Sequence, residues 1–130
     1  MMKRILIIDD DATVSAAAKI VLEANGFSVA SAADGPAGIR AVEREAFDLV
    51  ICDLFLPKMN GFETIKAIRT INPHVPIITA SGFMFASSQC PQMPNFEAMA
   101  AEAGATATLY KPFKPNDLLQ AIQRIPVLSV

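Results

Sequence analysis

The sequence is poor in the residues that usually build disulfide frameworks and metal centres of histidine or cysteine. Its 130 residues include no tryptophan, one tyrosine, one histidine and two cysteines. The histidine, His74, stands between Pro73 and Pro76, so we interpret it as a turn residue without a partner histidine for a metal site. Cys52 falls in an apolar run, typical of a small core residue, and Cys90 falls in a loop-like segment.

Charge and long apolar runs are also scarce. Charged residues make up 18% of the chain, the net charge is −2, and no basic stripe marks a nucleic-acid surface. No apolar run approaches the ~18 residues of a membrane span. The amino end from Met1 to Ile8 begins like a signal peptide, but three aspartates interrupt it and no small-residue cleavage site follows. We therefore expect a cytoplasmic protein that contacts neither nucleic acid nor membrane, and no disulfide.

The residues that are abundant predict one α/β domain over 1–130. Hydrophobic residues make up 52% of the chain, which suits a single core. Apolar runs alternate with stretches of helical spacing, and this alternation predicts a parallel sheet with helices on both faces. The expected strands are Ile5–Ile8, Phe27–Ala32, Phe47–Asp53, Val75–Ser81 and Ala105–Tyr110. The expected helices are Thr13–Asn25, Asp34–Glu45, Asn60–Asn72 and one that starts at Pro115.

One stretch, Gly82–Pro94, has no regular pattern. It holds two serines, Cys90 and two prolines, and its length is unusual for a connection inside a compact domain. It is either a functional loop or an insertion without a role.

Polar side chains gather where the expected strands end. The first strand is followed by Asp9 and Asp10, the third ends in Asp53, the fourth in Ser81, and the fifth runs into Lys111. Because the carboxyl ends of parallel strands share one edge of a sheet, these groups should meet there. Three clustered carboxylates repel one another unless a cation such as Mg²⁺ relieves them. A carboxylate beside a hydroxyl and an ammonium can accept a phosphoryl group as an aspartyl phosphate.

Four stretches make the chain resemble the receiver domain of two-component response regulators, over essentially its whole length. They are residues 5–11 (ILIIDDD), 53–61 (DLFLPKMNG), 75–82 (VPIITASG) and 111–113 (KPF). The resemblance implies a flavodoxin-like doubly wound fold with strand order 2-1-3-4-5. It also implies that Asp53 is the phosphoacceptor and that the donor is the phosphohistidine of a sensor histidine kinase or phosphotransfer protein.

The same resemblance implies the roles of the neighbouring residues. Mg²⁺ would be held by the Asp10 and Asp53 carboxylates and the Phe55 backbone carbonyl, with Asp9 acting largely through water. Ser81, five residues after Pro76, would be the switch hydroxyl, whereas Thr79 would lie inside the sheet. Lys111 would pair with the acceptor and then with the phosphoryl oxygens, and its peptide bond to Pro112 would be cis.

The sequence departs from the family pattern in its aromatic residues. The position three before the lysine, often aromatic in the family, is Thr108, while Tyr110 directly precedes Lys111. The usual coupling of that ring to the switch hydroxyl is therefore not expected here. The long Gly82–Pro94 stretch is expected to reshape the output face, formed by the fourth helix, fifth strand and fifth helix, through which partners or a second copy would bind.

Two phenylalanines suggest a slowly hydrolysing phosphoaspartate. Phe55 lies two residues after the acceptor and Phe83 two after Ser81, positions that by resemblance border the path of hydrolytic water. Bulky apolar side chains there would exclude water. The alternative is that both rings form a docking patch for a partner.

Other functions compete with this interpretation. Residues 9–13 (DDDAT) fit the nucleophile motif of haloacid-dehalogenase-type phosphatases, with Asp9 as nucleophile and Asp11 as acid/base. That family's later acidic metal motif and a cap insertion are missing, and Asp53 would have no role. A nucleotide-binding module is disfavoured because three aspartates repel a phosphate. A degenerate receiver that acts as a phosphorylation-independent adaptor is a third alternative. The sequence leaves open whether the chain stands alone or belongs to a longer protein.

Overall fold

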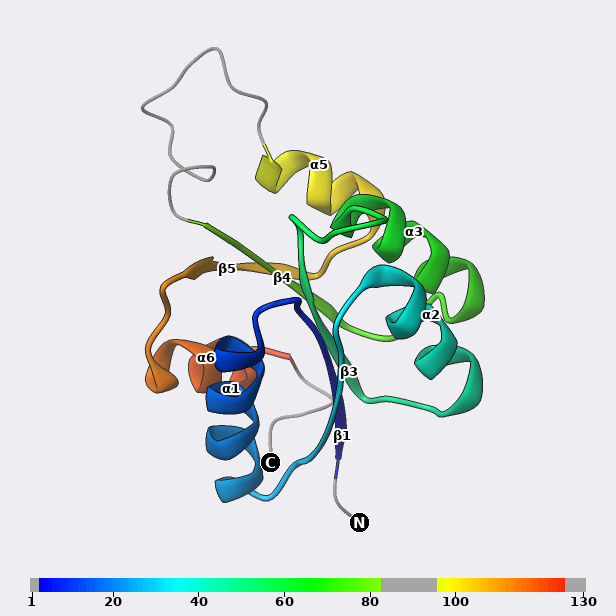
Figure 1. Cartoon of the computed structure of the whole chain (residues 1–130). Coiled ribbons are helices and arrows are strands. Elements are labelled where there is room, and N and C mark those ends of the chain that lie inside the picture. Colours follow the sequence, from blue (N-terminus) through cyan, green and yellow to red (C-terminus); the bar gives the residue numbers. More distant parts are fainter. Residues whose placement is uncertain (1–2, 83–95, 126–130) are drawn as a thin grey trace.

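The computed structural model describes residues 3–82 and 96–125, which form a five-stranded sheet covered by helices on both faces (Figure 1). All strand pairs are parallel, and the order is β2-β1-β3-β4-β5. The predicted fold class and strand order are confirmed. The strands are β1 (Arg4–Ile8), β2 (Ser28–Ala32), β3 (Leu49–Asp53), β4 (Ile77–Gly82) and β5 (Ala107–Lys111).

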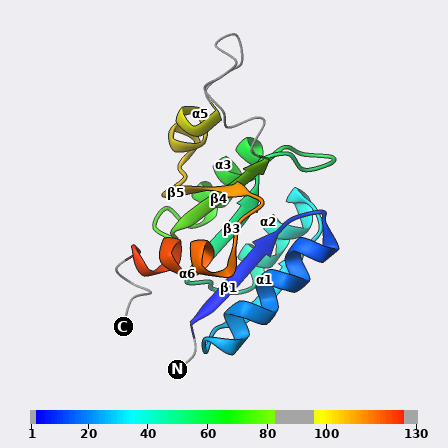
Figure 2. The same cartoon turned by 90° about the vertical axis from the view of Figure 1, so that its left-hand side faces the viewer.

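The helices divide between the two faces of the sheet. Helices α1 and α6 cover one face, while α2, α3 and α5 cover the other (Figures 1 and 2). Their bounds are α1 (Ala12–Ala24), α2 (Gly35–Arg44), α3 (Gly61–Ile71), α5 (Phe96–Ala103) and α6 (Pro115–Gln123). The output face expected from the resemblance corresponds to α5, β5 and α6.

Two apolar clusters hold these layers together. In β1, Ile5 and Ile7 point to the cluster under α1 and α6, while Leu6 and Ile8 point to the cluster under α2, α3 and α5. All four side chains are buried. Central strands buried on both faces are apolar at every position, which is why the sequence shows uninterrupted runs instead of alternation.

Apolar spacing alone missed helix α5, which only the resemblance implies as the fourth helix, and it began several strands too early. Half of the residues of helix α5 are alanines, and among its described side chains Ala100 and Ala103 belong to the core cluster. Small side chains give a weak apolar pattern even where they pack closely. Strand β4 begins at Ile77 and not at Val75, although the carbonyl of Pro76 still accepts a hydrogen bond from the Val50 amide at 3.0 Å. Most of the Gly82–Pro94 stretch lies outside the described residues.

The lengths and apolar content of the helices bear on whether the chain could cross a membrane. None of those within residues 3–82 and 96–125 is long and apolar enough to span a bilayer.

Candidate functional site

Three carboxylates meet where the two central strands end. Asp53 is the last residue of β3, and Asp9 directly follows β1, the neighbouring parallel strand. Ligand oxygens of Asp9, Asp10 and Asp53 all lie within 4.8 Å of one another. The side chains of Asp9 and Asp53 are buried, whereas Asp10 is exposed. The structure therefore brings together the three aspartates that the sequence placed at one sheet edge.

Lys111 joins this cluster from β5. Its Nζ atom lies 2.7 Å from Asp9 Oδ2 and 3.1 Å from Asp53 Oδ2, so one ammonium contacts both buried carboxylates. Burial alone would lower the pKa of Lys111, but the hydrogen bond to Asp9 and the charges of Asp53 and Asp9 outweigh it and hold that pKa above its usual value. Lys111 is therefore charged at neutral pH. The Lys111–Pro112 peptide bond is cis, as the resemblance predicts.

Each buried carboxylate also accepts a backbone hydrogen bond. The Asp11 amide donates to Asp9 Oδ1 at 2.9 Å, and the Phe55 amide donates to Asp53 Oδ1 at 3.0 Å. Burial nevertheless raises the pKa of Asp9, and the bonds from Lys111 and Asp11 only partly oppose this. Both carboxylates are thus fixed in orientation, with one oxygen on an amide and the other on Lys111.

The loop after β3 is held close to the site by Gly61. A Cβ atom at this position would lie 2.4 Å from the Asp53 carbonyl oxygen and from Leu54 Cα, so only glycine fits without movement of the backbone. The Gly61 amide donates to the Leu54 carbonyl at 2.8 Å. Farther out, Lys58 has a left-handed φ of 67° and its Nζ lies 3.2 Å from Asp34 Oδ2.

The hydroxyl residues of β4 occupy different environments. Ser81 is 1% exposed and lies one residue past Ala80, the register partner of Asp53, which places it at the edge where the carboxylates meet. Thr79 is fully buried, and its hydroxyl lies 3.2 Å from that of Thr108 on β5. The prediction that Thr79 lies inside the sheet is confirmed.

The aromatic residues singled out in the sequence lie on different parts of the surface. Phe55 is 39% exposed beside the cluster. Tyr110 is the register partner of Ser81 on β5 and is half-exposed. Phe83 lies outside the described residues, so the hypothesis of slow hydrolysis stays a prediction.

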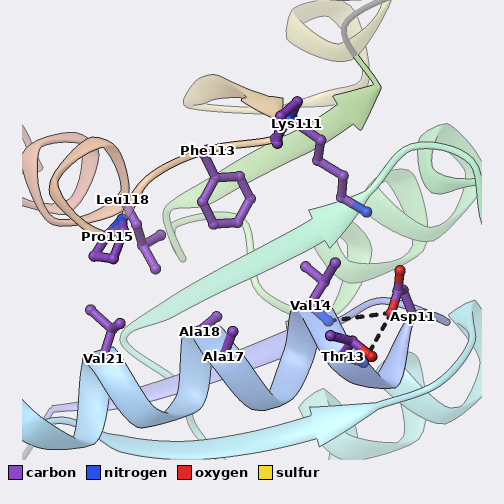
Figure 3. Close-up of a pocket in the computed structure, with 11 residues that line it drawn as sticks. Asp11, Thr13, Val14, Ala17, Ala18, Val21, Lys111, Phe113, Pro115 and Leu118 are labelled. Atoms are coloured by element: carbon purple, nitrogen blue, oxygen red, sulfur yellow. Dashed lines mark hydrogen bonds between the residues drawn. The ribbon is translucent and has the colours of Figure 1, made fainter.

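An apolar groove, which the sequence interpretation missed, opens beside Lys111. It lies between α1 and the segment from β5 to α6, and its volume is about 460 Å³. Figure 3 shows apolar side chains of α1 facing Phe113 and Leu118 across it. The signal was present, because Val14, Ala17, Ala18 and Val21 recur at helical spacing. Helical spacing alone does not distinguish the wall of an exposed groove from a core face, and of these four residues only Ala18 is buried.

The donor set of the cluster suits a hard divalent cation. Three carboxylates offer oxygen ligands only, and no histidine or cysteine lies among the three grouped ligands. Mg²⁺ is usually held by one or two carboxylates together with water, and the exposed Asp10 leaves one side of this cluster open to solvent. The residues present therefore fit a magnesium ion.

Comparison with known proteins gives the same family throughout. The response regulator receiver domain model matches residues 5–123. The DNA-binding response regulator MtrA of Mycobacterium tuberculosis is 34% identical over 95% of this chain, and the transcriptional regulatory protein ZraR of Salmonella typhimurium is 30% identical over 92%. The chain spans about half of the length of MtrA (50%) and a quarter of ZraR (25%).

Solved structures agree with the fold. The chemotaxis protein CheY4 of Vibrio cholerae superposes with a TM-score of 0.85 at 31% identity, covering 96% of this chain and 99% of that one. A CheY-like receiver domain protein from Methanospirillum hungatei superposes with a TM-score of 0.84 at 35% identity, covering 95% of this chain and 93% of the other. With its strand order, its strand-end aspartates and this match over 5–123, the chain belongs to the response regulator receiver domain family.

Proposed function

We propose that this chain, over residues 1–130, is a phosphorylation-activated signalling switch with Asp53 as its phosphoacceptor. The donor is the phosphohistidine of a sensor histidine kinase or of a phosphotransfer protein. The observation that carries the proposal is the position of Lys111 Nζ, 3.1 Å from Asp53 Oδ2 and 2.7 Å from Asp9 Oδ2, beside a cluster that can hold a cation. Phosphoryl transfer requires groups that position the phosphoryl group and neutralise its charge, and an ammonium beside a cation site can do both.

The residues supply the chemistry of the transfer. A carboxylate oxygen of Asp53 forms the new bond to phosphorus while the bond between phosphorus and the donor's histidine nitrogen breaks. Lys111 neutralises charge on the transferred oxygens. Asp9, Asp10, Asp53 and the Phe55 carbonyl would hold Mg²⁺, which supplies further charge neutralisation when bound. The chain catalyses only its own phosphorylation and slow dephosphorylation, so it acts as a switch and not as an enzyme on other substrates.

The switch step is a shift in population. The phosphoryl group adds charge beside Ser81 and Lys111, and whichever arrangement of the β3–α3 and β4–α5 connections engages it better gains population. The proposed output surface is the face of α5, β5 and α6, where partner binding or homodimer formation changes. Family membership supports a cytoplasmic location, and direct nucleic-acid contact by these residues is not expected.

The structure disfavours the phosphatase alternative. In that interpretation Asp9 is the nucleophile and Asp11 the acid/base. Instead, the Asp11 carboxylate caps α1 by accepting hydrogen bonds from the amides of Thr13 and Val14, which a general acid/base would have to give up. Asp53 would again have no role. The adaptor alternative differs only in needing no phosphoryl group.

Phosphorylation mapping tests the proposal. We would incubate the chain with Mg²⁺ and a small phosphodonor such as acetyl phosphate, then locate the added phosphoryl group by peptide mass mapping. One group on Asp53 is expected, with none on an Asp53→Asn variant and normal labelling of an Asp48→Asn control. Label on Asp9 would overturn the proposal. Partner capture that is equal for Asp53→Ala and for beryllofluoride-treated protein would favour the adaptor.

A further inference from the structure

The third aspartate of the run, Asp11, has no role in the proposed chemistry. Its carboxylate is not among the grouped ligand oxygens of Asp9, Asp10 and Asp53. It is the N-cap residue of α1, and its Oδ1 accepts hydrogen bonds from the Thr13 amide at 2.9 Å and the Val14 amide at 3.3 Å (Figure 3). Aspartate is among the best residues at this position.

The same residue also contacts the site through its backbone. The Asp11 amide donates to Asp9 Oδ1 at 2.9 Å, while Lys111 Nζ holds Asp9 Oδ2 at 2.7 Å. The Asp9 carboxylate is therefore held by two contacts, an ion pair with Lys111 and a hydrogen bond from the peptide unit of Asp11. The orientation of that peptide unit depends on the Asp11 backbone, which the cap fixes at φ −87° and ψ 105°.

We infer that Asp11 is a positioning residue for the cation site. Its side chain caps α1 and thereby fixes its own backbone, and its backbone amide in turn orients the Asp9 carboxylate. The inference rests on the proposed function in so far as that function needs Mg²⁺. Partners that orient a metal ligand from outside the ligand set typically change metal affinity 10- to 100-fold when they are lost. The cap should therefore influence Mg²⁺ binding although its side chain does not reach the ion.

Two simpler explanations make different predictions. If Asp11 acts only through its negative charge, then Asn and Ala should weaken Mg²⁺ binding equally. If it acts only by stabilising α1, then Ala should lower stability without changing Mg²⁺ affinity. Asparagine separates these cases because its side-chain oxygen caps a helix about as well as aspartate does, without the charge.

The test is a Mg²⁺ titration of the whole chain, followed by amide chemical shifts, for the wild type, Asp11→Asn and Asp11→Ala. The amide resonance of residue 11 in metal-free protein reports its bond to Asp9 directly. Asp34→Ala is a matched control, because Asp34 caps α2 through the Ala37 amide at 2.8 Å and is not among the grouped ligands. It removes a cap without touching Asp9.

We expect Asp11→Ala to weaken Mg²⁺ binding by about tenfold and to shift the residue 11 amide upfield. Asp11→Asn should keep most of the affinity and the resonance position, and Asp34→Ala should keep both. Equal weakening by Asn and Ala, unchanged affinity in Asp11→Ala, or a wild type that binds no Mg²⁺ would overturn the inference. Because metal binding is measured without a phosphodonor, a chain that binds Mg²⁺ but takes no label on Asp53 would refute the proposed function alone.

Discussion

The central strands β1 and β3 have an apolar body and a charged end, and the two parts follow different rules. In the body, side chains such as Leu6 and Leu49 are fully buried and each packs in one of two apolar clusters. At the ends, Asp9 and Asp53 are also buried, but as carboxylates close to each other and to Asp10. Burial of apolar area stabilises the fold, whereas burial of clustered like charge opposes it. The fold therefore gains its stability from the apolar strand bodies, whereas the charged cluster at the strand ends reduces it.

The largest effect is expected in the apolar body. Leu6→Ala removes a fully buried side chain between β1 and the helices α2 and α3, and should lower the free energy of unfolding by about 2–5 kcal/mol. Urea denaturation measures this change. The control is Ile20→Ala, because Ile20 is 70% exposed on α1 and its truncation should change stability by less than about 0.5 kcal/mol. Equal effects of the two variants would refute the assignment of the core.

The charged end should respond in the opposite way. Asp53→Asn removes one of three clustered carboxylates, while Lys111 keeps its contact with Asp9 at 2.7 Å. Relief of repulsion offsets the lost ion pair, so without metal the free energy of unfolding should fall by no more than about 1 kcal/mol and can rise. At Mg²⁺ concentrations about 100 times the Kd, the wild type should gain about 2.7 kcal/mol, and Asp53→Asn much less.

Denaturation with and without Mg²⁺ measures both parts of this prediction. Asp48→Asn is the matched control, because Asp48 accepts a hydrogen bond from the Arg4 amide at 2.7 Å and is not among the grouped ligands. It should gain as much from Mg²⁺ as the wild type. If Asp53→Asn gained as much as well, Asp53 would not be a ligand.

The same contrast explains what could be predicted from sequence. The apolar bodies of the strands are visible because burial on both faces leaves long runs of Ile, Leu and Val between turn residues. The convergence of Asp9, Asp10 and Asp53 then follows from parallel topology alone. Apolar spacing did not predict helix α5, because the buried residues among its described side chains, Ala100 and Ala103, are alanines that give little contrast with their exposed neighbours.

What the sequence could not give are contacts that depend on three-dimensional packing. The resemblance implies that Lys111 pairs with Asp53, and the structure shows that contact, but nothing in the sequence shows that the same ammonium also reaches Asp9. The two roles of Asp11, cap and amide donor, require the backbone geometry at the start of α1. The left-handed backbone of Lys58 and its ion pair with Asp34 likewise could not be predicted from the sequence.

A third region, where Asp34 pairs with the exposed Lys58, should show the smallest effect. The Asp34 carboxylate accepts a hydrogen bond from the Ala37 amide at 2.8 Å and lies 3.2 Å from Lys58 Nζ. Both contacts lower the pKa of Asp34, and the hydrogen bond from the Ala37 amide contributes most. A lowered folded pKa means that the ionised group stabilises the fold above its unfolded pKa of 3.8, and that this increment is lost as pH falls through the folded pKa. The stability difference between wild type and Asp34→Asn should therefore be constant above about pH 5 and shrink below pH ~4. Thermal denaturation across this range measures it, and a difference that grows on acidification would show that Asp34 is not stabilised as an anion.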